Sequence, residues 1–419
     1  MTISDLHDAA LYAWRDAGVR DAVLVHVDAH HDADAKESDG ITIANFVWWG
    51  IADGTLREVF WIVPDPSWKT TSGRTLIEQA LFTLARQHDD AAGVESGDGF
   101  VRTEIGGKPF TACPLHRLPA SLDALVDIDV DYFLVPDIAH ECAPIERAMP
   151  WTWPGDLVAA LRDARVNPAL VTIATSTRGG FTPLEWKYLG EEVCVRLSAG
   201  DVEPFDVLRA GAEAEHRGEL DGAEAGYRRA IELMPRSAGA RYRLARLYLG
   251  RGDNHAARTT FEEVLERDSS YRAIDSDGRR WHAERNFAAA ARAYRDTLRM
   301  DPQNPYASLG LAQLAAAEGD HAAAIVHFER ALRSDDGLVD GHRGLARSLE
   351  STGEVERAIA HYERSIRLEL VGHQAIDAAI ATLRPRVFDE MHWEVHRRLA
   401  GLRHDTRWLS AVDRVTSGS

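Results

Sequence analysis

The stretch Val23–Asp34, VLVHVDAHHDAD, decides the fold of the first half of the chain. Its apolar start is a run of branched residues, which is typical of a strand buried on both faces. Asp28, His30 and Asp32 follow at a spacing of two, so an extended chain would point all three side chains to one side. Sites in open α/β sheets lie beyond the carboxyl ends of the strands. The stretch therefore predicts a parallel strand that ends in a cluster of metal-ligating groups, and a solvated polar loop is the alternative.

A second acidic strand is predicted about a hundred residues later, in Leu122–Phe133, LDALVDIDVDYF. Asp127, Asp129 and Asp131 alternate with apolar residues, so an extended strand would turn the three carboxylates the same way. An unpaired carboxylate in a buried strand is costly, and three on one face imply a bound cation or protonation. The alternative is an edge strand with a solvated acidic face.

The rest of the first two hundred residues has the rhythm of βαβ units. Ile41–Gly50 and Glu58–Pro64 are rich in branched and aromatic residues, and Ala169–Thr175 reads as another buried strand. Helices are predicted at Leu76–Arg86 and Asp156–Ala164.

The loop Ser176–Trp186, STRGGFTPLEW, follows the last of these strands. Gly179 and Gly180 permit a tight turn, and Thr182-Pro183 is suited to begin a helix. We expect this loop to close one wall of the site.

Composition excludes some functions. The 419 residues carry 48 Lys+Arg against 66 Asp+Glu, a formal net charge of −18, which disfavours nucleic acid as a partner. Metal ions, cationic ligands and basic peptides are favoured instead. There is no signal-like start and no run of about 18 uncharged apolar residues, so we predict a cytoplasmic protein without a membrane segment.

The ligand types favour manganese. Carboxylate-rich sites with one or two imidazoles suit Mn²⁺ better than Zn²⁺, which prefers fewer and softer ligands. Four or more acids indicate two ions, and two adjacent dications can activate water and stabilise the charge that develops in a hydrolytic reaction.

These motifs resemble a known superfamily. Asp28-Ala29-His30-His31-Asp32 matches the DAHxD motif of the arginase/agmatinase/deacetylase superfamily, and Asp129-Val130-Asp131 resembles its DxD motif. The ordered set HVDAHHD, IANFVWWGI, VFWIVP, DIDVDYF and VTIATS…GGFTP resembles the arginase-like family once catalogued as uncharacterised protein family 0489. Some members of that family are peptide arginases, which convert arginine residues of ribosomally made precursor peptides to ornithine. The resemblance covers about residues 1–200 and implies an arginase-like three-layer α/β domain with a mainly parallel sheet.

The resemblance also implies roles for individual residues. Asp28 and Asp129 would bridge two manganese ions, while His30, Asp32 and Asp131 would each bind one ion. Asp32 would also be the catalytic residue that hydrogen-bonds the attacking water and shuttles its proton to the leaving amine.

Other ligands are less directly assigned. His7, in DLHDAALYAW, is the candidate for the remaining imidazole ligand, with a surface histidine as the alternative. Asp127 and His26 would support the ligands from behind, although Asp127 and Asp129 could instead be the DxD pair. His31 is expected to be a bystander.

Two residues of the later loop bear on the substrate. Arginases bind guanidinium with a glutamate, and Glu185 is the candidate here, with a helix-start residue as the alternative. Deacetylases of the superfamily use a tyrosine in a similar loop, whereas this sequence has Phe181, which cannot donate a hydrogen bond. This difference favours guanidino hydrolysis.

The second half of the chain is a repeat array. Aromatic residues recur at intervals of 34, 33, 34 and 34, at Tyr227, Phe261, Tyr294, Phe328 and Tyr362. Small and turn residues recur with the same period, at Gly211, Ala245, Gly278, Ala312 and Ala346 and at Gly218, Gly252, Asn286, Gly319 and Gly353. Five helix-turn-helix units resembling tetratricopeptide repeats are predicted. Such arrays present a groove to a peptide or partner protein, or serve only assembly.

The resulting hypothesis has three segments. Residues 1–203 form the metallohydrolase domain, residues 204–371 the five repeats, and residues 372–419 capping helices and a frayed tail. The expected function is a dimanganese peptide arginase whose repeats hold an arginine-containing peptide. The alternatives are a small-molecule amidinohydrolase or deacetylase with repeats for assembly, and a non-catalytic adaptor.

Overall fold

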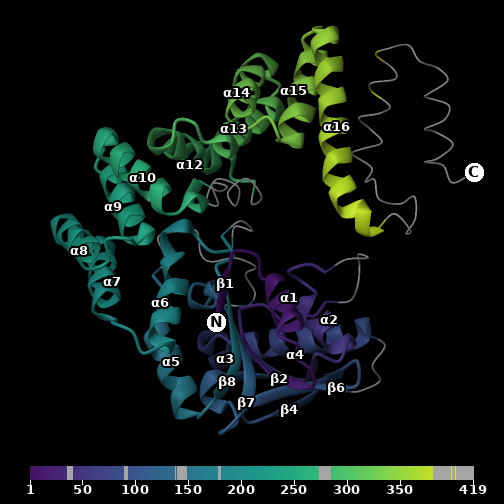
Figure 1. Cartoon of the computed structure of the whole chain (residues 1–419), viewed down its shortest axis with the longest axis vertical. Helices are drawn as coiled ribbons and strands as arrows, with labels where there is room; N and C mark the ends of the chain where they lie inside the picture. The colour runs from purple at the N-terminus through teal and green to yellow at the C-terminus, as the bar shows by residue number, and fades with distance from the viewer. Residues whose placement is uncertain are drawn as a thin grey trace, which may run out of the picture. The chain divides into compact units, whose positions relative to one another are not determined.

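The computed structural model describes residues 1–34, 41–88, 93–136, 138, 149–177, 181–272, 285–380, 398 and 402 (Figure 1). The chain divides into two compact units, Met1–Asp277 and Gly278–Ser419. The first unit contains a mixed α/β domain together with the first helix pairs of the repeat array. The boundary expected after residue 203 coincides with the start of helix α7, Glu203–His216, yet α7 belongs to the same compact unit as the α/β domain.

The α/β domain is built on one eight-stranded sheet of order β1-β8-β7-β2-β3-β6-β5-β4. Neighbours from β1 to β6 pair in parallel, whereas β6, β5 and β4 pair antiparallel. This confirms the prediction of an α/β domain with a mainly parallel sheet. The strands are β1 (Thr2–Ser4), β2 (Ala22–Val27), β3 (Leu56–Val63), β4 (Glu95–Gly97), β5 (Phe100–Ile105), β6 (Lys108–Pro114), β7 (Asp123–Asp129) and β8 (Asn167–Ala174).

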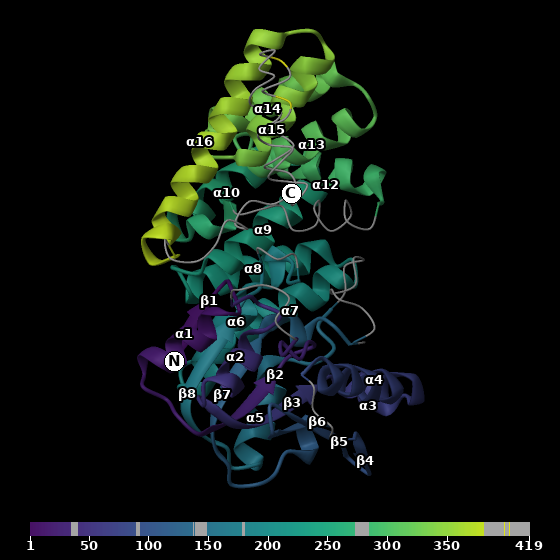
Figure 2. The same ribbon diagram turned by 90° about the vertical axis from the view of Figure 1, so that its right-hand side faces the viewer.

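The described helices of this domain flank the sheet (Figure 1). Leu24 of β2 shares a buried core with Trp14 and Phe46, which come from the first two helices. Figure 2 shows α3 and α4 beside the part of the sheet that carries β5 and β6. The helices are α1 (Ala9–Asp16), α2 (Phe46–Ala52), α3 (Asp65–Lys69), α4 (Thr71–Gln87), α5 (Pro154–Asp163) and α6 (Tyr188–Leu197), with 3-10 turns η1 (Leu115–Arg117), η2 (Val130–Phe133) and η3 (Leu184–Trp186).

The two acidic strands end earlier than an extended chain would. β2 stops at Val27, and the Asp28 carboxylate accepts the backbone N–H of His30 at 2.7 Å. In the same way β7 stops at Asp129, whose carboxylate accepts the N–H of Asp131 at 3.1 Å. Aspartate favours such turns because its side chain can bond to the backbone two residues on. The prediction that the ligands project from continuing strands was therefore wrong; two turns gather them.

The strand-like segment Ile41–Gly50 instead leads into helix α2. Its buried residues Phe46, Val47, Gly50 and Ile51 follow helical spacing, which outweighs the high strand propensity of the aromatic and branched side chains. Gly50 is required there, because a Cβ would come within 2.9 Å of Leu56.

The repeat array consists of antiparallel helix pairs, as predicted. The recurring aromatic residues Tyr227, Phe261, Tyr294, Phe328 and Tyr362 are all buried. Residues 273–284, which include the predicted small residue Gly278, lie outside the described residues. The described helices are α7, α8 (Leu220–Leu233), α9 (Ala238–Gly250) and α10 (Asn254–Arg267), followed by η4 (Ser269–Arg272), α12 (Phe287–Met300), α13 (Pro305–Ala317), α14 (His321–Ser334), α15 (Val339–Ser351) and α16 (Val355–Ile380).

The turns within the repeats correct one position. Gly218, Gly252 and Gly319 have positive φ between the two helices of their repeats, where glycine is unstrained. In the third repeat the left-handed residue is Arg285, with φ +58°, and not the predicted Asn286. Asn286 instead caps α12, because its side chain accepts the N–H of Ala289.

The segment after the repeats is described in part. The boundary expected at residue 372 falls inside α16, which continues to Ile380. Arg398 donates to Glu350 at 3.1 Å, and Leu402 packs against the apolar cluster of the last repeats. The other residues of the expected cap and tail beyond Ile380 lie outside the described residues. Within the described part of the chain, no helix combines the length and hydropathy needed to cross a membrane.

Candidate metal centre

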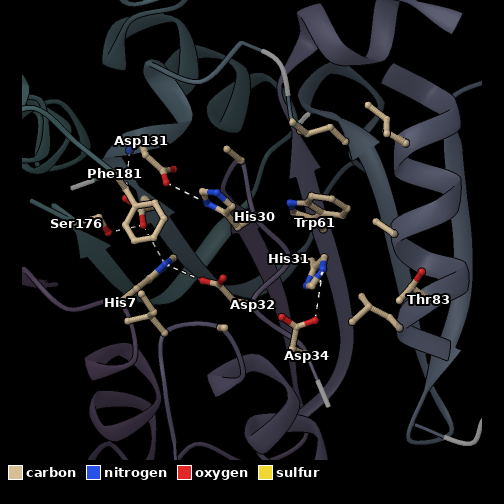
Figure 3. Close-up of a pocket in the computed structure, with 18 of the residues that line it drawn as sticks. His7, His30, His31, Asp32, Asp34, Trp61, Thr83, Asp131, Ser176 and Phe181 are labelled. Atoms are coloured by element: carbon tan, nitrogen blue, oxygen red, sulfur yellow. Dashed lines mark hydrogen bonds and ion pairs between the residues drawn. The ribbon is translucent and has the colours of Figure 1, made fainter. Parts of the chain in front are cut away.

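Four neighbouring strands bring the predicted ligands together. His7 lies in the turn between β1 and α1, Asp28 to Asp32 follow β2, and Asp129 and Asp131 stand at the end of β7 and on η2. β1, β8, β7 and β2 are adjacent and parallel, so their carboxyl ends open at the same edge of the sheet. Figure 3 shows His7, His30, Asp32 and Asp131 directed toward one another at this edge.

The first set of groups surrounds the Nδ1 atom of His7. Asp32 Oδ2 lies 3.0 Å from this nitrogen, and Asp28 Oδ2 and Asp129 Oδ2 each lie 3.1 Å from it. All four side chains are buried or nearly so. One imidazole nitrogen cannot hydrogen-bond well to three carboxylates at once, so the arrangement is that of ligand atoms around a shared cation.

The second set surrounds His30. Its Nδ1 atom lies 3.1 Å from Asp131 Oδ2 and 3.3 Å from Asp28 Oδ1. Asp28 therefore contributes one oxygen to each set. The Ser176 hydroxyl, just beyond β8, donates to Asp129 Oδ2 at 2.5 Å and fixes that carboxylate.

Asp127 lies behind the ligands. Its Oδ2 atom accepts from His7 Nε2 at 2.7 Å and from His26 Nδ1 at 3.0 Å, while the Thr172 hydroxyl donates to Oδ1 at 2.5 Å. A proton on His7 Nε2 leaves the lone pair of Nδ1 directed at the carboxylates, which is how a metal-binding imidazole is oriented. Burial alone would raise the pKa of Asp127, but His7 and His26 lower it to about 2.

Without a cation the cluster is short of positive charge. Burial, and then the charge of Asp28, raise the pKa of Asp32 to about 6. Burial and the neighbouring Asp129 raise the pKa of Asp131 well above its usual value. The pKa of His30 is raised, against the effect of burial, by Asp131 and Asp28. A bound dication would supply the charge that protons otherwise provide.

Several buried oxygens fit a metal ion. Among the described residues, no group donates a well-directed hydrogen bond to Asp28 Oδ2 or to either carboxylate oxygen of Asp131. Buried carboxylate oxygens are costly without partners, whereas oxygen and imidazole ligands of this kind suit Mn²⁺. The residues present therefore fit a centre for one or two divalent ions.

The loop that carries three of the ligands is held from outside. The carbonyl of Asp32 accepts the backbone N–H of Val47 at the start of α2, at 3.0 Å. His88, at the end of α4, bonds the carbonyl of Ala33 at 2.8 Å. Asp32 itself has a φ of +48°, which aspartate tolerates better than most residues. These contacts account for the position of the ligand loop.

The structure separates the predicted site residues into two groups. It brings together His7, Asp28, His30, Asp32, Asp129 and Asp131, with Asp127 and His26 behind them. Of the two registers left open for the second motif, the Asp129/Asp131 pair faces both histidines. Glu185 is elsewhere: its carboxylate lies 3.6 Å from Arg243 and 4.0 Å from Arg246, because η3 turns it toward helix α9. Gly179 and Gly180 lie outside the described residues.

Sequence reasoning missed two supporting residues. Ser176 and Thr172 belong to the end of β8, where position at a carboxyl end was the available signal.

A cavity of about 630 Å³ opens from the cluster. Phe181 covers the cluster, its ring centroid 5.4 Å from that of His30, and His31 packs edge-on against Trp61 with centroids 5.7 Å apart. From there the cavity continues to one side of α4, where Thr83 lies (Figure 3). Its volume is within the range of ligand-binding sites, about 300–1,000 Å³.

Replacing Asp127 with asparagine is expected to weaken divalent-metal binding by about 10–100-fold, the usual cost of losing a group that orients a ligand. Asparagine keeps the shape of the side chain but removes its charge and one acceptor. Titration calorimetry with manganese measures the change. Asp123→Asn, at the exposed start of the same strand, serves as the control, and equal affinities for both variants would contradict the role of Asp127.

The fold and the cluster together define a mixed α/β domain with a candidate metal centre, followed by an all-helical repeat region. Residues 215–275 and 283–339 match two family models, each described as the tetratricopeptide repeat. No curated protein matches the chain.

Solved structures resemble the helical part. PilF of Pseudomonas aeruginosa is 18% identical, with 52% of this chain and 93% of that chain covered and a TM-score of 0.29. MamA is 18% identical, with 39% and 96% covered and a TM-score of 0.24. A thermophilic tetratricopeptide-repeat protein of Thermus thermophilus is 19% identical, with 48% and 99% covered and a TM-score of 0.22.

Proposed function

We propose that the α/β domain is an arginase-like dimanganese hydrolase that converts arginine residues of a peptide to ornithine with release of urea. The observation that carries the proposal is the pair of ligand sets around His7 and His30, which share Asp28. His7 and Asp32 would bind one ion, His30 and Asp131 the other, and Asp28 and Asp129 both.

Two manganese ions, when bound, would supply Lewis acidity and a water molecule that is acidic at neutral pH. In the proposed reaction water attacks the guanidinium carbon, the bond to the side-chain nitrogen breaks, and ornithine and urea are formed. Asp32, which lines the cavity, accepts the proton of the attacking water and returns it to the leaving amine. Phe181 covers the cluster and limits the access of bulk water.

The charges of the cavity favour a peptide over free arginine. Among the described lining residues there is no Lys or Arg, whereas Asp32 and Asp34 both face the cavity. The carboxylate of a free amino acid would therefore meet like charge, whereas a peptide bond at that position is neutral. The tetratricopeptide repeats are consistent with binding a peptide or a protein, and the net charge of −18 favours a basic one.

A second candidate function is a metal-dependent hydrolase with a different substrate. Glu185 was the candidate for binding guanidinium, and its contacts with Arg243 and Arg246 place it outside the cavity. This favours a small amidino or N-acyl compound, with the repeats serving assembly or acting as an adaptor.

The test is urea release by the manganese-loaded chain on free arginine and on arginine-containing peptides, with mass spectrometry of the peptides. We expect ornithine and urea from peptides, and none after removal of manganese by a chelator. Urea from free arginine alone would move the function to small-molecule metabolism. No urea from either would contradict amidinohydrolysis and direct the search to deacetylation and the adaptor function.

A further inference from the structure

The cavity has a second half that the metal cluster does not use. It is formed by one side of α4 and by the indole of β3, and we call it the α4 annex: Trp61, Leu76, Ala80, Thr83 and Leu84. Figure 3 shows Thr83 on the opposite side of the cavity from His7, with Trp61 and His31 between them. None of the five annex side chains carries a charge.

The sequence of α4 explains why this surface is apolar and in place. Leu76, Ala80, Thr83 and Leu84 recur at helical spacing, so they lie on one side of the helix. Buried residues on the adjoining side, among them Ile77 and Leu81, anchor α4 in the core of the domain. The helix begins at a cap in which the Thr70 hydroxyl accepts the N–H of Gly73 at 3.0 Å.

The annex is tied to the metal cluster. The indole N–H of Trp61 donates to the carbonyl of Asp28 at 3.0 Å, and Trp61 is 2% exposed. His88, at the end of α4, bonds the carbonyl of Ala33 in the ligand loop. The distance from the cluster to the annex is therefore fixed by the fold, as a specificity pocket requires.

A substrate that reacts at the cluster leaves the annex to be filled by its neighbouring groups. Water there would face apolar carbon on most sides, whereas an aliphatic side chain would bury it. A charged neighbour would lose hydration in the annex without gaining an ion-pair partner from the annex side chains.

We propose that the α4 annex binds an aliphatic side chain next to the reacting arginine, so that the substrate is a peptide in which leucine, isoleucine or valine adjoins arginine. This inference rests on the proposed function. It names a feature of the substrate that hydrolysis at the cluster alone does not require.

The first test compares short peptides with one arginine, flanked by glycine, by leucine before or after the arginine, or by glutamate on either side. The full chain loaded with manganese is used, and kcat/KM for urea release is measured. We expect at least one leucine peptide to exceed the glycine peptide by about tenfold or more, the usual effect of filling an apolar pocket. Glutamate at the same position should give the lowest value.

A matched pair of variants locates the preference. Thr83→Asp places a carboxylate in the annex, whereas Thr75→Asp places one on an exposed part of α4 that does not line the cavity. The leucine preference should fall to near one for Thr83→Asp and stay at the wild-type value for Thr75→Asp. An equal preference in both variants would overturn the assignment to the annex.

Failure of this inference is distinguishable from failure of the proposed function. Equal urea release from all peptides would overturn the annex as a specificity pocket and leave peptide hydrolysis standing. Absence of urea from every peptide would contradict the proposed function. In that case calorimetric binding of the same peptides still decides, because leucine peptides that bind wild-type chain no more tightly than glycine peptides overturn the annex.

Discussion

Asp28→Asn is expected to lower manganese-dependent urea release by about 10³-fold or more, since Lewis-acid catalysis contributes several kcal/mol. Asp28 contributes one oxygen to each ligand set: Oδ2 lies 3.1 Å from His7 and Oδ1 3.3 Å from His30. Asparagine retains the shape of the side chain but offers one weak oxygen ligand in place of two charged ones. Both sets lose their shared group, so this substitution should be more damaging than the loss of a ligand to one ion.

The measurement for Asp28→Asn combines urea release with the manganese content of the protein after gel filtration. Asp21→Asn is the matched control, because Asp21 precedes the same strand and is exposed to solvent. A normal circular dichroism spectrum of both variants shows that the comparison concerns the site. If Asp28→Asn kept two bound manganese ions and wild-type activity, the proposed centre would be wrong.

Arg243→Ala is expected to destabilise the first unit by about 3 kcal/mol, the cost of breaking a buried ion pair by removing one partner. The Arg243 guanidinium is 5% exposed and lies 3.2 Å from Glu215 and 3.6 Å from Glu185. It also stacks on Trp186, 4.5 Å from the ring centroid, and donates to the Tyr227 hydroxyl at 3.1 Å. These partners come from η3, α7 and α8, so one side chain joins the α/β domain to the first repeats.

Chemical denaturation of the full chain, followed by tryptophan fluorescence, measures the effect of Arg243→Ala. Arg229→Ala is the control, because its ion pair with Glu232 is exposed and should contribute less than about 1 kcal/mol. Equal denaturation midpoints for the two variants would show that Arg243 does not hold the domain and the repeats together.

The features that could be predicted from sequence depend on local pattern. The buried strands β2 and β7 follow from uninterrupted apolar runs that end in acids, and the repeats follow from a period kept by residues such as Tyr227 and Tyr362. The ligand types at Asp28, His30 and Asp129 were also readable, because buried carboxylates and imidazoles in such numbers require a partner of opposite charge.

The features that could not be predicted depend on the backbone between elements or on distant contacts. A spacing of two suggested that Asp28, His30 and Asp32 share a strand, whereas an aspartate turn ends it. Glu185 could not be placed, since its partner Arg243 lies in another domain of the sequence. The α4 annex combines residues of β3 and α4 whose proximity no local pattern encodes.

The most direct test of the account is the manganese content of the folded protein, measured by anomalous X-ray diffraction from crystals soaked in manganese. We predict two sites about 3.5–4 Å apart, one beside His7 and Asp32 and one beside His30 and Asp131. Diffraction that shows no manganese at these residues, at an ion concentration that saturates known dimanganese hydrolases, would contradict the account.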